Sequence, residues 1–156
     1  MAEYNSVMNN RLYEVCGTLS DEVRKKDIRL FFKSIHKTLD HLLYGDMAWL
    51  LRFIDKEGDV PDIGQELYAQ FDDLTKARKA WDQKLIVWSN SISDDWLEGD
   101  FSYTSKVDGK IRTKPTWLLV THMFNHGTHH RGQLTTSLNQ LGIDFGVTDL
   151  PFFINE

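Results

Sequence analysis

Apolar residues recur every three or four positions along four stretches of the chain, which is the spacing of one face of an α-helix. The first stretch predicts a helix that ends near Gly17, with apolar positions at Tyr4, Met8, Leu12, Val15 and Leu19. The second and third predict helices over residues 30–54 and 65–92, and the fourth begins after Pro115 and runs to Leu141, where Gly142 supplies a left-handed stop. These four helices predict an all-α fold, a four-helix bundle.

The pattern changes between the third and fourth helices. The segments FSYTSKV and KIRTK flank Asp108-Gly109, a pair of residues typical of a two-residue hairpin turn, so a small β-hairpin is predicted there. Residues 20–27 are expected to form a polar connection, and residues 55–64 are rich in residues that break helices. The C-terminal segment DFGVTDLPFF is apolar enough that we expect it to fold back on the bundle.

Composition narrows the class of protein. A chain of 156 residues with 41% hydrophobic residues indicates a single domain, residues 1–156, with a substantial core. The net charge of −5 argues against a nucleic-acid-binding surface, and no stretch is apolar enough to span a membrane. The single cysteine, Cys16, has no partner for an intramolecular disulfide. No basic start followed by an apolar run precedes the first helix, so we expect a cytoplasmic protein.

The segment THMFNHGTHHRGQ, residues 121–133, holds four of the six histidines. His126 and His130 are one helical turn apart, on one face of the fourth helix. They continue an apolar stripe formed by Leu119, Met123, Leu134, Leu138 and Leu141. A buried imidazole needs a hydrogen-bond partner, a charge or a metal, so the pair is a candidate metal site. The alternative is a polar helix face with one or two hydrogen-bonded core histidines.

A divalent ion needs a third protein ligand from a neighbouring helix. The second helix offers His36 and His41. His41 is preferred because small residues at Thr38, Gly45 and Ala48 leave room beside it, whereas His36, next to Lys33 and Lys37, is expected at the surface. His122 and His129 are secondary candidates, and Asp46 is a possible carboxylate neighbour.

Two segments, FKSIHKTLDHLLYGDMAWLLR and HMFNHGTHHRGQLTTSLNQLGIDFGVTDL, resemble the DinB/YfiT-like metalloprotein family. The order and spacing of these segments match the family from end to end. The resemblance implies a DinB-like four-helix bundle in which a divalent metal, nickel or zinc, is held by one histidine of the second helix and two of the fourth. Matched residue by residue, the ligands are His41, His126 and His130.

The function implied is a metal-dependent enzyme of hydrolase or thiol S-transferase type acting on an unknown small molecule. Three imidazoles leave coordination positions open, and a metal lowers the pKa of bound water or thiol. Related members of the family look like thiol-dependent transferases, so the resemblance implies a low-molecular-weight thiol as a cofactor. No catalytic acid or base is identified. Of the flanking residues Asn125, Arg131 and Gln133, Arg131 is interpreted as a structural ion pair.

The alternative is a non-enzymatic protein, either a stress-responsive metal-binding bundle or a structural module that dimerises. A homodimer is expected from the family resemblance. Neither a nucleic acid nor a membrane is expected as a partner.

Overall fold

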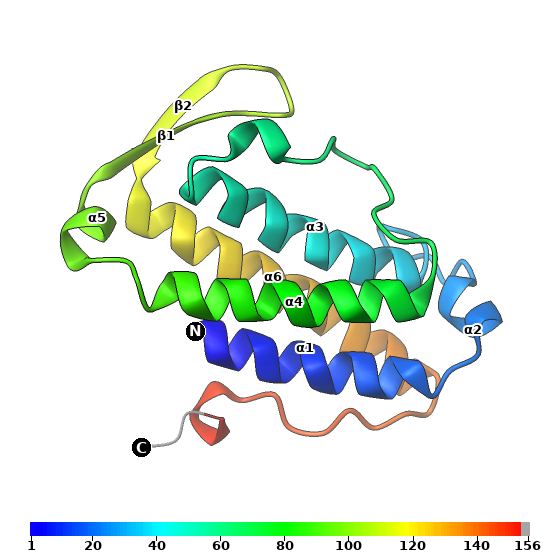
Figure 1. The fold of residues 1–156 in the computed structure, drawn as a ribbon. Helices are drawn as coiled ribbons and strands as arrows, with labels where there is room; N and C mark the ends of the chain where they lie inside the picture. Colours follow the sequence, from blue (N-terminus) through cyan, green and yellow to red (C-terminus); the bar gives the residue numbers. More distant parts are fainter. Residues whose placement is uncertain (154–156) are drawn as a thin grey trace.

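The computed structural model describes residues 1–153 and is mostly helical (Figure 1). The longer helices are α1 (Ala2–Gly17), α3 (Ile35–Phe53), α4 (Phe71–Ser89) and α6 (Thr116–Gln140). Shorter elements occupy the connections: α2 (Asp21–Lys25), α5 (Asp94–Glu98), the 3-10 turns η1 (Glu57–Asp59) and η2 (Leu150–Phe152), and the strands β1 (Asp100–Thr104) and β2 (Ile111–Pro115). The predicted all-α class therefore holds, with one small antiparallel sheet added.

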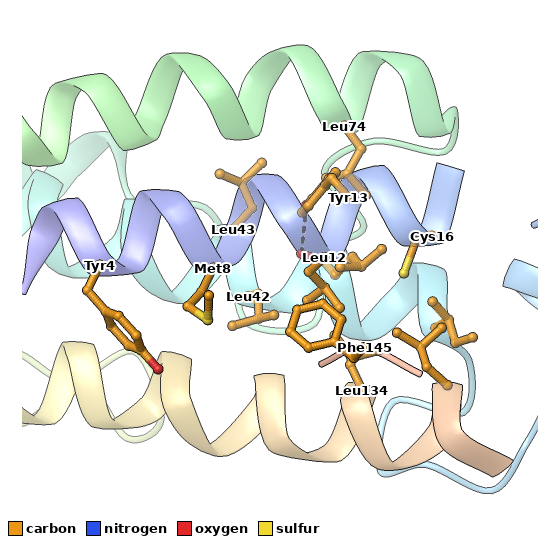
Figure 2. Packing of buried hydrophobic residues seen from close by; sticks show 13 residues of the cluster. Tyr4, Met8, Leu12, Tyr13, Cys16, Leu42, Leu43, Leu74, Leu134 and Phe145 are labelled. Atoms are coloured by element: carbon orange, nitrogen blue, oxygen red, sulfur yellow. Dashed lines mark hydrogen bonds between the residues drawn. The ribbon is translucent and has the colours of Figure 1, made fainter. Parts of the chain in front are cut away.

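The long helices bury their apolar stripes against one another. Helix α1 packs on α4, and α3 packs on α6. Helix α3 also contacts α4, and α1 also contacts α6. Figure 2 shows how side chains of α1, α3, α4 and α6 meet in one buried cluster, closed by Phe145 from the C-terminal segment. A second cluster lies toward the hairpin and includes Leu50, Leu85, Leu119 and Met123. Leu141, predicted as the last residue of the α6 stripe, is 44% exposed, so the buried face ends at Leu138.

The predicted second and third helices are longer than the observed ones. Helix α3 begins at Ile35 because Ser34 accepts a hydrogen bond from the backbone nitrogen of Lys37, which caps the helix there. The preceding residues cannot be helical, since Arg29 and Lys33 have φ values of +61° and +70°. Helix α4 likewise begins only at Phe71, because the backbone nitrogens of Leu67 and Tyr68 are held by the side chain of Asp40 in the first turns of α3.

The polar connection predicted over residues 20–27 contains a helix that the apolar pattern does not reveal. Ser20 accepts a hydrogen bond from the backbone nitrogen of Val23 and caps α2. Ser93 caps α5 in the same way through the nitrogen of Trp96. Five-residue helices are too short to display a 3.6-residue period, so capping serines are their main sequence signal.

The predicted hairpin is present, but its turn is longer than two residues. The strands pair from Asp100 with Pro115 to Thr104 with Ile111, which leaves residues 105–110 as the loop. Within it, Ser105 donates its backbone N–H to Lys110 and accepts one from Gly109, whose φ is +70°. The Asp108-Gly109 signal thus marks the left-handed position of a six-residue loop.

The C-terminal segment folds back as predicted. It runs along α1, below that helix in Figure 1. Arg11 donates hydrogen bonds to the carbonyl oxygens of Phe145 and Val147, and the Tyr4 hydroxyl donates to Thr148 at 2.6 Å. Residues 154–156 of the chain lie outside the described residues.

The expectation that His36 faces solvent is wrong. Its side chain is 1% exposed, and Nε2 lies 2.8 Å from the carbonyl oxygen of Tyr68. Asp40, one turn further along α3, accepts hydrogen bonds from the backbone nitrogens of Leu67 and Tyr68. The connection between α3 and α4 therefore covers this face, which the neighbouring lysines do not indicate. Within residues 1–153, none of the helices combines the length and apolar character needed to cross a membrane.

Candidate metal centre

The α3–α6 interface brings together three histidines, His41 from α3 and His126 and His130 from α6. The helices approach closely at Gly45, where an added Cβ would lie 2.6 Å from Cε1 of His126. Glycine therefore provides the space into which the His126 ring fits. This agrees with the prediction that small residues beside His41 leave room between the helices.

The Nε2 atoms of the three rings converge. His126 Nε2 lies 3.1 Å from Nε2 of His41 and 3.1 Å from Nε2 of His130, and one ligand nitrogen from each ring lies within 4.8 Å of the others. A neutral imidazole has one N–H and one lone pair, so three such rings meeting at their Nε2 atoms cannot all be satisfied by one another. The arrangement leaves lone pairs aimed at a common point.

Burial keeps these rings neutral. Burial, together with repulsion from His130, lowers the pKa of His126 to about 3 and the pKa of His41 to about 4. Burial also lowers the pKa of His130, against the opposing effect of its hydrogen bond with Gln133. Metal binding requires the neutral form, so the cluster is ready to accept an ion at neutral pH without releasing protons.

The geometry fits a divalent ion. Nitrogens about 2.05 Å from a tetrahedral zinc ion are about 3.3 Å apart, and those at right angles on an octahedral ion are about 2.9 Å apart. The two edges of 3.1 Å fall between these values, and the ligand nitrogens of all three rings lie within 4.8 Å of one another. Imidazole nitrogens suit zinc, nickel and copper better than magnesium or calcium, which prefer oxygen ligands.

Two neighbouring side chains fix the ring orientations. Gln133 Oε1 lies 2.8 Å from Nδ1 of His130, so Nδ1–H donates to it and Nε2 is left with the lone pair that binds a metal. Phe32 stacks on His41 with 3.8 Å between ring centroids and also contacts the edge of His130. From the sequence, Gln133 was expected only to flank the ligands, and Phe32 was expected within the helix predicted over residues 30–54. Phe32 lies instead in the connection before α3.

The other candidates lie outside the cluster. His129 is exposed and contacts Gln133, and His122 is exposed with its ring 5.4 Å from that of Trp49. Asp46, proposed as a possible carboxylate neighbour, instead pairs with Arg78 of α4, with 2.8 Å between the two side chains. Arg131 does not form the ion pair that the sequence suggested, because it donates to the side-chain oxygens of Asn5 and Asn9. Asn125 is exposed.

Replacing Gly45 with alanine will weaken metal binding while leaving the fold intact. The new methyl group would lie 2.6 Å from Cε1 and 2.8 Å from Nδ1 of His126, so the ring must turn away. We expect a loss of metal affinity of about 10- to 100-fold, comparable to the loss of a ligand-orienting contact. Alanine also favours helix over glycine by about 1 kcal/mol, so thermal stability should not fall sharply.

The matched control is Gly132→Ala on α6, where nothing lies within 4 Å of the added Cβ. Equal metal affinity in both variants would contradict the expected clash.

Replacing Gln133 with leucine will lower metal affinity by about tenfold or more, because the Nδ1–H of His130 loses its acceptor and the ring loses its fixed tautomer. Competition with a chromophoric chelator measures the change. Gln140, exposed on the same helix, provides the control Gln140→Leu, which should bind as tightly as the wild-type protein.

Comparison with known proteins identifies the family of this chain. The sequence model of the DinB family matches residues 1–156. The chain is also 25% identical to Protein DinB of Bacillus subtilis (strain 168) over 158 aligned positions, which cover 97% of this chain and 90% of that protein. Because the family match spans the whole length, the chain belongs to the DinB family.

Proposed function

We propose that this protein is a single-domain DinB-type four-helix bundle that binds one divalent metal ion through Nε2 of His41, His126 and His130. The convergence of three neutral imidazoles, with Nε2 atoms 3.1 Å apart along two edges, carries the proposal. Nickel and zinc are the favoured ions, because both accept three imidazole nitrogens and retain free positions.

The proposed chemistry is that of a hydrolase or a thiol S-transferase. A divalent ion with three protein ligands lowers the pKa of a coordinated water or small thiol when it is bound. The chain's own residues orient the ligands and restrict water. Gln133 fixes the tautomer of His130, and Phe32 covers the His41 ring at 3.8 Å. The buried thiol of Cys16 is no nucleophile, since burial raises its pKa to about 12.

The test is metal analysis of protein purified without a histidine tag. About one nickel or zinc ion per chain is expected, and cobalt exchanged into the site should give the visible absorption bands of nitrogen coordination. An ion content below about a tenth per chain after incubation with each metal would overturn the proposal. Activity is then tested with small thiols and electrophilic acceptors, together with ester and amide substrates.

A non-enzymatic metal-binding protein is the second candidate. One observation favours it: among residues 1–153, no carboxylate lines the cavity that both His41 and His126 face, and Asp40 and Glu66 line only a separate, smaller cavity beside His41. Full metal occupancy without turnover of any substrate class would support this second function. A homodimer is a further proposal, based on family membership, and sedimentation equilibrium would give twice the chain mass if it is correct.

A further inference from the structure

A cavity of about 210 Å³ lies between α3, the start of α6 and the loop of the hairpin. His41 and His126 line one part of it, and Arg52 and Lys106 line another. The candidate metal centre therefore opens into a space that also contains two cationic side chains. The volume is small compared with drug-binding pockets, which indicates a small ligand.

The helical geometry of α3 gives the layout of this cavity. His41, Gly45, Ala48 and Arg52 follow one another at steps of four, three and four residues, so they share one face of the helix. The Arg52 side chain turns back along the helix, and its Nη1 donates to the carbonyl oxygen of Ala48 at 3.0 Å. At 1.5 Å per residue, that carbonyl lies about 10 Å along the axis from His41, and about 5 Å from Gly45, where the His126 ring packs.

Arg52 is buried without a close counter-charge. The side chain is 8% exposed, and its Nε has no hydrogen-bond partner among the described residues. The nearest carboxylate oxygen, Oε1 of Glu57, lies 3.9 Å away and accepts the backbone N–H of Thr104 at 2.6 Å. Trp49 and Tyr103 hold the guanidinium by cation–π contacts at 5.2 and 5.7 Å. A buried, incompletely paired arginine is costly unless an anion completes it.

The rest of the lining strengthens the positive charge. Lys106, from the hairpin loop, pairs only loosely with Asp62, at 3.7 Å, and that aspartate is 89% exposed. No acidic side chain in residues 1–153 lines the cavity. In a chain with a net charge of −5, this concentration of cationic groups beside the histidines sets the cavity apart from the overall acidic surface.

We propose that this cavity binds a small monoanionic ligand whose carboxylate pairs with Arg52 while its other end reaches the histidine cluster. The planar guanidinium matches a carboxylate with two parallel hydrogen bonds. Arg52 is the buried cation and balances one negative charge, whereas Lys106 is 32% exposed and already lies 3.7 Å from Asp62, so it adds a weaker attraction. The proposal deepens the proposed function by naming the substrate class, and its second end depends on the metal centre.

The test uses cobalt-loaded full-length protein and two probes of equal length, 4-mercaptobutanoate and its neutral amide, 4-mercaptobutanamide. The thiol releases its proton and coordinates cobalt, and the sulfur-to-cobalt absorption band reports binding. We expect the acid to bind at least about tenfold more tightly than the amide, the gain typical of a charge-assisted hydrogen bond. In Arg52→Gln this preference should fall to about twofold or less.

The control is Arg112→Gln, an arginine of β2 that pairs with Asp108 and does not line the cavity. It should keep the full preference for the acid. Should Arg52→Gln fold poorly by thermal unfolding, Arg52→Lys replaces it, because lysine retains the charge without the planar fork and should show an intermediate preference. The same acid-to-amide ratio in wild type and the Arg52 variant would overturn the proposal, as would inorganic phosphate competing more strongly than butanoate.

A second arm separates this proposal from the metal centre. Saturation-transfer NMR compares binding of butanoate and butanamide to metal-free protein, in the wild type and in Arg52→Gln. A preference for butanoate that depends on Arg52 supports the anion site even if cobalt fails to bind. If cobalt binds but neither 4-mercaptobutanoate nor butanoate binds more tightly than its amide, the metal proposal stands and the anion site is refuted.

Discussion

Replacing His126 with alanine will lower the affinity for zinc or nickel by more than about a hundredfold. His126 is the central member of the cluster, since its Nε2 lies 3.1 Å from Nε2 of both other rings. A four-ligand structural zinc site contributes about 10–16 kcal/mol, so one ligand contributes roughly 3 kcal/mol, or about two orders of magnitude in affinity. Its loss also leaves only His41 and His130, from different helices, to hold the ion.

Competition titration against a chelator of known affinity measures this effect. His129→Ala is the matched control, because His129 is exposed on the same helix and only three residues away. It should bind metal like the wild-type protein, which also excludes adventitious binding by the histidine-rich segment. His41→Ala and His130→Ala should each resemble His126→Ala. Equal weakening by His126→Ala and His129→Ala would refute the three-histidine site.

Helix periodicity accounts for how much of this site the sequence could predict. His126 and His130 differ by four residues within an apolar stripe, so a local rule places both on the buried face of α6. His41 lies on another helix, so local spacing could not identify it; it was preferred over His36 because the residues beside it are small. Gly45 then proves to be the point where the His126 ring fits against α3.

Contacts made by connecting segments could not be predicted in this way. Phe32 reaches His41 from a stretch where Lys33 has a φ of +70°, which no periodic pattern encodes. His36 is buried because residues 67 and 68 fold over it, held by Asp40. Arg52 belongs to the cavity because the hairpin loop closes over α3. Each of these contacts depends on how a loop crosses a helix, and periodicity carries no information on that.

Arg78 of α4 lies in the interior of the bundle, at 1% exposure. A charged residue in an apolar stripe is explained only by its partners. Arg78 forms ion pairs with Asp46 of α3 at 2.8 Å and Asp82 of α4 at 2.7 Å. The Asp46 partner is 32 residues away in sequence, so local spacing cannot identify it.

These charges belong to a polar network that joins the long helices. Asn5 of α1 donates to Asp46 at 3.1 Å, and Asn9 donates to Asp82 at 2.9 Å. Arg131 of α6 donates to the side-chain oxygens of both asparagines. Two arginines and two aspartates balance each other, so the network carries no net charge into the core. The network also holds the side chain of Asp46, which directly follows Gly45, the residue of α3 against which the His126 ring packs.

Replacing Arg78 with methionine will therefore lower the free energy of unfolding by about 3–5 kcal/mol, the usual cost of removing one partner from a buried ion pair. Asp46 and Asp82, each 2% exposed, would be left without their cation. Urea unfolding followed by circular dichroism measures the change.

The control is Lys79→Met, at an exposed position of the same helix, which should change the free energy of unfolding by less than about 0.5 kcal/mol. The triple variant Arg78→Met/Asp46→Asn/Asp82→Asn should regain part of the loss, because it removes the stranded charges along with the arginine. A loss in Arg78→Met no larger than that in Lys79→Met would mean that the network contributes little to the fold and that the aspartates find other partners.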